Sequence, residues 1–337
     1  MTAAPVGADS EVTALVGRLA GLREQIGRAI VGQEGVTTEL LIGLLAGGHV
    51  LLEGVPGLAK TLLVRTLARA VDATFRRIQF TPDLMPTDIV GTEVLEEDHT
   101  SGRRFLKFMQ GPIFTNILLA DEINRTPPKT QAALLEAMQE GEVTYGGKTY
   151  ELPKPFFVLA TQNPIEQSGT YPLPEAQLDR FLLLIRIGYP DHKEEQEILR
   201  RTTGEAVPEI QAVLTGAELQ RLQRLVRSVH ISDDLLEYAS RVVRSTRPEQ
   251  TELAMVKESV RWGAGPRAGQ ALVLTAKARA LVMGRFAATL DDLKAVAAPV
   301  LRHRILVSFR AEAESIGPDA IAAEVIARVP PPRSPLG

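Results

Sequence analysis

The feature that most constrains this chain is a phosphate-loop pattern placed between a strand and a helix. The residues GVPGLAKT (54–61) follow the short apolar run 49–53 and precede a helical pattern that continues to about residue 71. Glycines let the loop backbone curl so that its N–H groups point at phosphate oxygens, and the helix N-terminus adds partial positive charge. Lys60 can then reach the β- and γ-phosphates of a nucleotide, and the Thr61 hydroxyl can bind Mg²⁺.

The loop departs from the strict pattern at one position, where Ala59 replaces the last glycine. Alanine tolerates a helix-entry backbone, so we interpret the change as mild. The alternative, a glycine turn beside an exposed lysine, is disfavoured by the flanking strand and helix. The residues expected to hold the nucleotide here are Gly54, Val55, Pro56, Gly57, Leu58, Ala59, Lys60, Thr61 and Leu62.

Apolar runs typical of buried strands alternate with helical patterns over the first 190 residues. This alternation predicts an α/β fold, a P-loop NTPase αβα sandwich with a five-stranded parallel sheet. Helices are expected at 11–30, 34–46, 60–71 and 126–140, the last with Thr126 as N-cap and Pro127 as first residue. The strand candidates are 49–53, 75–80, 117–121, 156–161 and 181–187.

Two segments interrupt the alternation and are typical of inserted β-hairpins. Residues 142–152 alternate around Gly146-Gly147, and residues 91–110 turn near Thr100-Ser101-Gly102. Neither hairpin is needed to complete the sheet.

The chain is expected to divide into four parts. A flexible tail (1–10) precedes the nucleotide-binding core (11–189), which is followed by an α-helical domain (190–328) and a Pro-rich disordered tail (329–337). In the α-helical domain, the periodicity predicts helices at about 191–203, 215–229, 232–246, 266–287, 290–308 and 318–328.

Two adjacent carboxylates, Asp121 and Glu122, end the apolar run 117–121. A buried strand carries them to the carboxyl edge of the sheet beside the phosphate loop. There Asp121 would enter the Mg²⁺ shell, and Glu122 would orient or deprotonate an attacking water. Such a pair alone is as often a helix N-cap, but the upstream loop favours the catalytic role, and an acid placed for water favours hydrolysis over transfer.

Three other polar residues are weaker candidates. Asn163 follows the run 156–161 and could face the γ-phosphate and hold the water, although asparagine before proline is also common in turns. Arg180 lies just before the last strand, and Arg267 opens a helix of the second domain. Their chemistry alone does not distinguish them from the other arginines.

Composition excludes several classes of function. The chain has no cysteine, and its five histidines are scattered, which excludes thiolate chemistry and disfavours zinc. A net charge of −3 gives no general field for nucleic acid. The N-terminus lacks a basic, apolar leader, and the longest apolar run of about thirteen residues is too short for a membrane span. We expect a soluble, cytoplasmic protein.

Five motifs in this order resemble the MoxR branch of AAA+ ATPases: GVPGLAKT, LLADEINR, ATQNP, YPLPEAQLDRF and WGAGPRAGQAL. The resemblance covers about residues 20–310. It implies ATP and Mg²⁺ as cofactors, a helical lid with the nucleotide between lid and core, and a ring, usually a hexamer. It also implies chaperone-like action on partners with von Willebrand A domains, or a role in metal insertion.

Carried over by position, the resemblance assigns roles to individual residues. Lys60 and Thr61 match Walker A, and Asp121 and Glu122 match Walker B. Asn163 matches the first sensor, and Arg180 matches the arginine finger that reaches the neighbouring subunit's nucleotide. Arg267 matches the second sensor, which would touch the γ-phosphate of its own subunit. The segment Val31-Gly32-Gln33 matches the adenine cradle, and the two hairpins match the branch's inserts.

The leading hypothesis is an ATP-hydrolysing ring that remodels a protein partner. A ring acting on nucleic acid is the first alternative, since Tyr145 and Tyr150 could grip a peptide or stack a base. The basic residues of the hairpins are few: Arg103, Arg104, Lys107 and Lys148. A nucleotide-switched scaffold is the second alternative, and Glu122 argues against it because a switch needs no water-activating acid.

Overall fold

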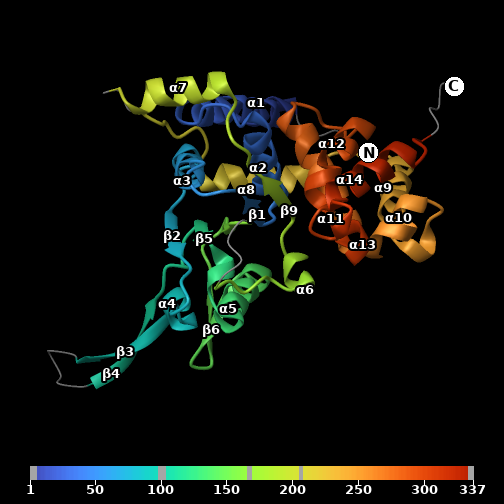
Figure 1. Ribbon diagram of the computed structural model, residues 1–337. Helices are drawn as coiled ribbons and strands as arrows, with labels where there is room; N and C mark the ends of the chain where they lie inside the picture. The colour runs from blue at the N-terminus through green and yellow to red at the C-terminus, as the bar shows by residue number, and fades with distance from the viewer. Residues whose placement is uncertain (1–5, 98–103, 165–168, 205–207, 333–337) are drawn as a thin grey trace.

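Five parallel strands form the central sheet of the computed structural model, which describes residues 6–97, 104–164, 169–204 and 208–332 (Figure 1). The predicted fold class is confirmed, because each predicted apolar run contains one strand and all neighbours pair in parallel. In spatial order the strands are β2 (Phe75–Gln79), β5 (Ile117–Asp121), β8 (Phe157–Gln162), β1 (Val50–Glu53) and β9 (Leu183–Arg186).

Helices cover both faces of this sheet. Alternate strand residues point to opposite faces, so Val50 and Leu52 of β1 join one apolar core while Leu51 joins the other. The first core also takes side chains from α1 (Val6–Ala29), α2 (Glu34–Ala46) and α3 (Lys60–Ala70). The second core takes side chains from α4 (Pro86–Val90) and α5 (Pro128–Glu140).

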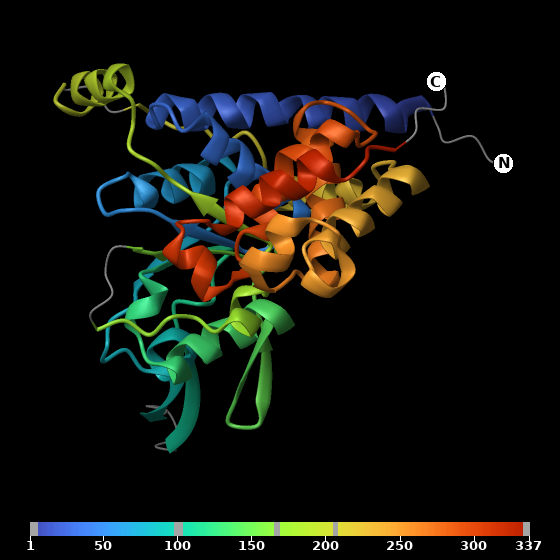
Figure 2. The ribbon, with the colours of Figure 1, turned by 45° about the vertical axis from the view of Figure 1, so that its right-hand side comes forward.

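The first helix begins earlier than expected. Residues 6–10, predicted to belong to a flexible tail, form the start of α1, which Figure 2 shows lying along one edge of the molecule. Proline favours the start of a helix and not its interior, and Pro5 is the last proline before α1. The buried residues Leu19, Leu22 and Ile26 then hold the helix against the core.

The start of α5 differs by one position from the prediction. Thr126 is extended, and Pro127, not Thr126, is the residue that precedes the helix, with no side-chain cap. The cause is the second proline, Pro128, because a residue before proline is disfavoured in the helical region. Pro128 therefore takes the first helical position.

Both predicted hairpins are present as separate two-stranded antiparallel ribbons. The first consists of β3 (Gly91–Glu97) and β4 (Arg104–Gln110), and its predicted turn at 100–102 lies outside the described residues. The second consists of β6 (Glu142–Tyr145) and β7 (Lys148–Glu151). Gly146 and Gly147 both have positive φ, as the tight turn between these strands requires.

The C-terminal region is mostly helical, but the prediction of helices alone was wrong. A short ribbon pairs β10 (Val260–Trp262) with β11 (Leu306–Val307), so the helix predicted at 290–308 ends earlier, at Leu301. The helix predicted at 266–287 ends at Val282, just before Gly284, which has φ +74°. The helical elements here are α7 (His192–Thr202), α8 (Gly216–Ser228), α9 (Asp233–Ser245), η2 (Pro248–Gln250), α10 (Ala254–Ser259), α11 (Pro266–Val282), α12 (Leu290–Leu301), α13 (Phe309–Ala313) and α14 (Pro318–Arg328).

The helical region is not separated from the sheet by solvent. Helix α11 packs directly against α2, and one continuous apolar core joins the first face of the sheet to α8, α9, α11, α12 and α14. Among the described residues, no helix has the length and apolar character needed to cross a membrane.

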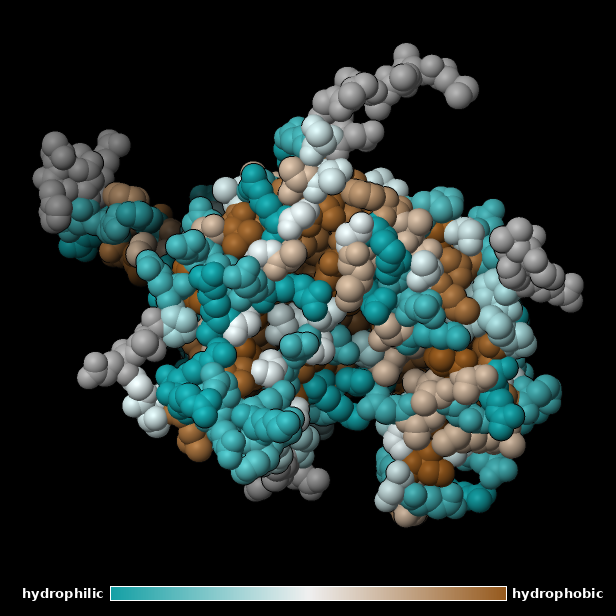
Figure 3. Space-filling view, turned by 90° about the horizontal axis from the view of Figure 1, so that it is seen from above, coloured by the Kyte–Doolittle hydropathy of each residue, from teal (hydrophilic) through white to brown (hydrophobic). Residues whose placement is uncertain are grey.

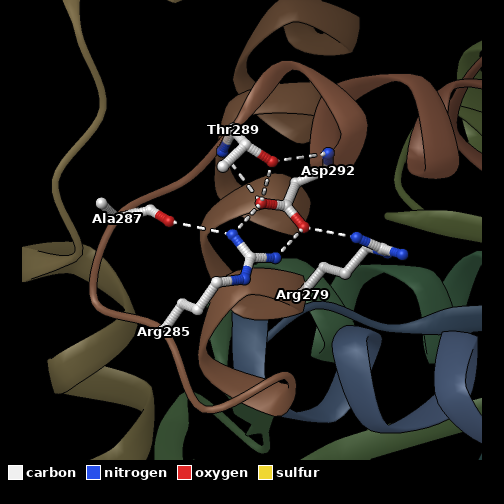
Figure 4. A network of polar contacts seen from close by, with 5 residues as sticks. All are labelled: Arg279, Arg285, Ala287, Thr289 and Asp292. Atoms are coloured by element: carbon white, nitrogen blue, oxygen red, sulfur yellow. Dashed lines mark hydrogen bonds and ion pairs between the residues drawn. The ribbon is translucent and has the colours of Figure 1, made fainter.

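A buried carboxylate ties the end of α11 to the start of α12 (Figure 4). Asp292 accepts hydrogen bonds from Arg285 at 2.6 and 2.8 Å, from Arg279 at 2.5 Å, and from the backbone and hydroxyl of Thr289 at 2.9 Å each. Burial alone would raise the pKa of Asp292, but the hydrogen bonds from Arg285, Thr289 and Arg279 outweigh it and the pKa lies below its ordinary value.

We expect Asp292→Asn to lower the free energy of unfolding by about 2–4 kcal/mol at pH 7, because two arginines lose their counter-charge. A lowered folded pKa means that the carboxylate's contribution is complete above the unfolded pKa of about 3.9 and is lost as the pH falls through the folded value. Urea unfolding from pH 7 to about pH 3 should therefore show the difference in free energy of unfolding from wild type narrowing as the pH falls below about 4. The neighbouring exposed Asp291→Asn is the control, and an equal loss in both variants would contradict this assignment.

Candidate nucleotide site

The loop between β1 and α3 has a backbone shaped to receive an anion. Gly57 has φ +87°, and Gly54 lies so close to Ile187 that an added Cβ would sit 2.1 Å from the Ile187 side chain. Within the described chain, no backbone N–H of residues 55–59 donates to a backbone carbonyl. These free donors, with the start of α3 behind them, are what a phosphate group requires.

Ala59 takes a left-handed conformation, with φ 54° and ψ 22°, directly before α3. The sequence argument assumed a helix-entry backbone at this position, so the departure from glycine is less mild than expected. A left-handed alanine costs roughly 1–2 kcal/mol relative to the right-handed form. The loop therefore stores a small strain at the point where it meets the helix.

Lys60 begins α3 and turns back over the loop, where its Nζ donates to the Gly54 carbonyl at 2.6 Å. Burial lowers the pKa of Lys60, and the charges of Asp121 and Glu122 oppose that shift without cancelling it. The lysine and the two carboxylates thus lie close enough to interact electrostatically, as the sequence predicted for the carboxyl edge of a parallel sheet.

Asp121 ends β5 and is buried, with both of its oxygens engaged. Its Oδ1 accepts from the Thr161 hydroxyl at 2.6 Å, and its Oδ2 accepts from Nε and Nη2 of Arg77 at 3.1 and 2.7 Å. The sequence analysis missed Arg77. The sequence does show that Arg77 and Gln79, two residues apart on β2, share one face of the strand. It does not show that β2 pairs with β5, and that pairing brings Arg77 to Asp121.

Glu122 is held in a left-handed conformation, φ 58°, just before the 3-10 helix η1 (Ile123–Arg125). Its backbone N–H donates to the Thr161 hydroxyl, and its Oε2 accepts from Gln79 at 2.6 Å and contacts Arg125 at 3.2 Å. Since Arg77 also donates to Gln79 at 2.6 Å, side chains from β2 link the two acidic residues.

Asn163 follows β8 immediately and is buried. Strand β8 lies between β5 and β1, so Asn163 is carried to the same edge of the sheet as Asp121 and the phosphate loop. This is the placement that the sequence predicted. Its amide role at a γ-phosphate stays a prediction.

A cavity of about 360 Å³ adjoins the loop, and we call it the base pocket. It is lined by Val31 and Gln33 on one side, by residues 56–59 and Leu62 on another, and by Tyr189 and α7 on a third. Gly32 and Gln33 both have positive φ, and the Gln33 amide donates to the Gly188 carbonyl at 3.0 Å. The predicted adenine segment thus meets the phosphate loop across a space suited to a planar base.

The described residues contain no cluster of three or more acidic or histidine side chains that could hold a metal alone. Thr61 and Asp121 remain the candidate ligands, and they suit Mg²⁺, which usually takes one or two protein oxygens together with phosphates and water. Asp121 Oδ1 accepts one hydrogen bond and keeps a lone pair, whereas Oδ2 already accepts two from Arg77.

Arg180 and Arg267 lie together at the amino edge of the sheet, where the parallel strands begin. The phosphate loop lies at the carboxyl edge, where the strands end. The two arginines line one cavity of about 320 Å³, the arginine pocket, together with His49 at the start of β1. Arg267 approaches Asp179 at 3.8 Å. In this structure Arg267 lies away from the phosphate loop, since β1 spans about 13 Å between this edge and that loop, so its expected contact with its own nucleotide stays a prediction that this conformation does not favour. Packing of α11 against α2 fixes that position.

A second arginine that the sequence analysis did not single out, Arg304, anchors this edge. It is nearly fully buried, donates to Asp179 at 2.7 Å and to the Phe181 and Leu182 carbonyls at 2.7 and 3.1 Å. Burial lowers the pKa of Arg304, and Asp179 opposes this shift. Through Arg304 the helical region thus hydrogen-bonds to residues on both sides of Arg180.

Comparisons with known proteins agree with this arrangement. Residues 49–183 match the profile of the "ATPase family associated with various cellular activities (AAA)", and residues 252–325 match an AAA lid domain. The chain is 46% identical to "Chaperone MoxR1" of Mycobacterium tuberculosis, covering 98% of this chain and 86% of that protein. It is 32% identical to "Protein MoxR" of Paracoccus denitrificans, covering 96% and 99%.

A solved structure gives the same result. A crystal structure of a Cytophaga hutchinsonii protein assigned as an ATPase superposes with a TM-score of 0.89 at 42% identity, covering 97% of this chain and 98% of that one.

We expect Gly54→Ala to lower the free energy of unfolding by about 2–3 kcal/mol, because the added methyl group collides with Ile187. Gly35→Ala is the matched control. Its Cβ would meet nothing within 4 Å, and alanine favours the helix. Urea unfolding should show the first variant destabilised and the second unchanged or stabilised. Equal stability of the two variants would show that the loop is not closely packed on Ile187.

Proposed function

Because the chain belongs to the MoxR family of AAA+ ATPases, we propose that it hydrolyses ATP and uses the reaction to remodel a protein partner. The observation that carries the proposal is the phosphate loop itself. Its amides are free of backbone partners, and Lys60 lies within electrostatic reach of Asp121 and Glu122.

The residues divide the work of the reaction as follows. The loop amides and Lys60 bind the phosphate oxygens, and Lys60 exchanges the Gly54 carbonyl for them. Asn163 positions the attacking water and Glu122 accepts its proton or orients it. Gln79 and Arg125 fix the direction of the Glu122 carboxylate. Mg²⁺, when bound at Thr61 and Asp121, would neutralise charge that develops on the phosphates.

Arg180 and Arg267 complete the site of a neighbouring subunit in this proposal. Both lie at the amino edge of the sheet, too far from their own loop, so a triphosphate they contact belongs to another copy. One surface then meets a different surface of the next copy, and such head-to-tail contacts form a ring when the rotation between copies closes. We propose a hexamer with Arg180 as arginine finger and Arg267 as a second arginine acting in trans.

The exposed apolar residues are consistent with this packing. Tyr189 and Leu199 are exposed at the base pocket, and Trp262 and Phe309 are exposed in the helical region. Trp262 lies in the β10 strand that precedes Arg267, and Phe309 follows its partner strand β11. Large exposed aromatic side chains of this kind are common at protein interfaces.

Family resemblance favours a client with a von Willebrand A domain or a metal-containing protein that requires maturation, acted on in the cytoplasm. The similarity to Chaperone MoxR1 supports a protein client.

Substitutions of two residues separate binding from hydrolysis. We expect Lys60→Ala to weaken ATP binding by at least about tenfold, because phosphate charge is no longer neutralised. We expect Glu122→Gln to bind normally and lose about 10²-fold or more of turnover, because the carboxylate acts on the water. Fluorescent-ATP titration beside phosphate release measures both. Tight binding by the lysine variant, or normal turnover by the glutamine variant, would contradict the roles.

Mixed assemblies test the arginines. Lys60→Ala has no working loop but still offers Arg267, whereas Arg267→Ala has a loop but no arginine to offer. Each alone should be inactive, and an equal mixture should recover up to about a quarter of wild-type activity if sites act independently. Arg180→Ala should also be inactive alone and should recover activity when mixed with Lys60→Ala, since an arginine finger raises turnover by about 10³–10⁵-fold.

A second mixture provides the control. Lys60→Ala combined with Glu122→Gln should stay inactive, because both residues serve their own subunit's nucleotide. If subunit exchange is verified and the Arg267→Ala mixture behaves like this control, Arg267 does not act in trans.

A further inference from the structure

The ribbon of β3 and β4 exposes an unusual amount of apolar surface. It projects from the body at the left of Figures 1 and 3, where hydrophobic residues show among hydrophilic ones. An exposed apolar surface of this kind is uncommon on soluble proteins and marks an interaction site. The exposed apolar side chains and their exposed fractions are Val94 36%, Leu95 61%, Phe105 46%, Leu106 63% and Met109 48%.

The strand register places these side chains on defined faces. Leu95 lies directly opposite Leu106, and the pair one repeat closer to the body is Glu93 with Phe108. Because residues two apart share a face, Leu95, Leu106 and Phe108 form one continuous surface. Val94, Phe105 and Met109 are each one residue from these positions, so they lie on the other face.

Phe108 joins this ribbon to the second hairpin. Its ring stacks on Tyr150 with centroids 4.4 Å apart and contacts Tyr145 at 5.2 Å. The tyrosines that the sequence suggested as gripping residues are thus engaged in holding the two inserts together. The exposed apolar surface continues from this aromatic contact outward along β3 and β4, to Leu95 and Leu106.

The charges of the described ribbon do not favour a phosphate backbone. Lys107 pairs with Glu96 at 3.0 Å and Arg104 pairs with Glu97 at 3.1 Å, so both cations of the described strands are neutralised. A nucleic-acid site gains most of its affinity from cations that are free to neutralise phosphates. The partner of this surface is therefore polypeptide.

The ribbon also leaves backbone groups free. In the described chain β3 and β4 pair only with each other, so the outer edge of each strand has N–H and C=O groups that no other strand takes. Such edges accept an added strand, with main-chain hydrogen bonds giving affinity and side-chain contacts giving selectivity.

We infer that the β3–β4 ribbon binds an extended, apolar segment of a protein client, through Leu95 and Leu106 and a free strand edge. The inference rests on the proposed remodelling function and names the class of segment that the machine engages. An extended segment presents side chains to the leucine pair while its backbone meets the edge. A folded client with its apolar residues buried does not fit.

Cross-linking locates the contact, because the chain has no cysteine and a single introduced one is unique. Leu106→Cys labelled with benzophenone-maleimide should cross-link, in the presence of ATP, to reduced and carboxymethylated α-lactalbumin, a permanently unfolded protein. Met283→Cys, an exposed apolar position at the end of α11, is the control and should not cross-link. Cross-links confined to other copies of this chain, or seen equally in the control, would overturn the inference.

Affinity provides the second test. Leu95→Ser combined with Leu106→Ser should weaken binding of the same fluorescent unfolded protein by about ten- to hundredfold in anisotropy titrations. Met283→Ser should bind the unfolded protein as tightly as wild type does. A labelled single-stranded DNA should bind neither the wild type nor this control. The inference would be overturned if the double variant bound the unfolded protein as tightly as wild type does. It would also be overturned if the wild type bound the DNA tightly and the two leucine substitutions weakened that binding.

Turnover without client, measured on the same samples, separates the two proposals. Normal turnover in the double variant with lost client binding supports the inference. Absent turnover in the wild type refutes the proposed function alone, since client binding is measured independently.

Discussion

In a parallel sheet all strands begin at one edge and end at the opposite edge. This separation decides which of the candidate site residues can lie together. The phosphate loop follows β1, and the Asp121–Glu122 pair and Asn163 follow neighbouring strands, so all lie at the carboxyl edge. Arg180 and Arg267 lie at the amino edge, about 13 Å away. Arg304 holds the start of β9, and with it the neighbouring Arg180, at that edge of the sheet. In the proposed ring, the chemistry of the site therefore depends on how neighbouring copies assemble.

Backbone strain gathers at the same place. The described chain has five non-glycine residues with positive φ, and three of them, Gln33, Ala59 and Glu122, belong to the proposed nucleotide site. Each such conformation costs on the order of 1–3 kcal/mol and persists only when surrounding contacts enforce it. Here the enforcing contacts are the Gln33 amide on Gly188 and the Thr161 hydroxyl on the Glu122 amide. The large shared core beneath the sheet and the helical region supplies the stability against which this strain is held.

The sequence predicted the parts whose signal is local. Strand–loop–helix order, glycine placement and apolar runs are short-range patterns, so the sheet, the loop and both hairpins followed from them. The β10–β11 ribbon did not, because strands of two or three residues have no periodicity to detect. Arg77 and Arg304 also escaped notice, since their partners lie 44 and 125 positions away in the chain. Arg267 was assigned to its own nucleotide because resemblance named a role, whereas its position in the fold depends on the packing of α11 on α2, which no local pattern reveals.

In the proposed assembly, each nucleotide is bound by the carboxyl edge of one copy and the amino edge of the next. A cryo-electron microscopy structure of the Glu122→Gln protein with ATP and Mg²⁺ measures this directly. The account predicts the guanidinium groups of Arg180 and Arg267 within about 3 Å of phosphate oxygens held by the neighbouring subunit's Lys60. Either guanidinium on the phosphates of its own subunit's loop, or a nucleotide fully enclosed by one chain, would contradict it.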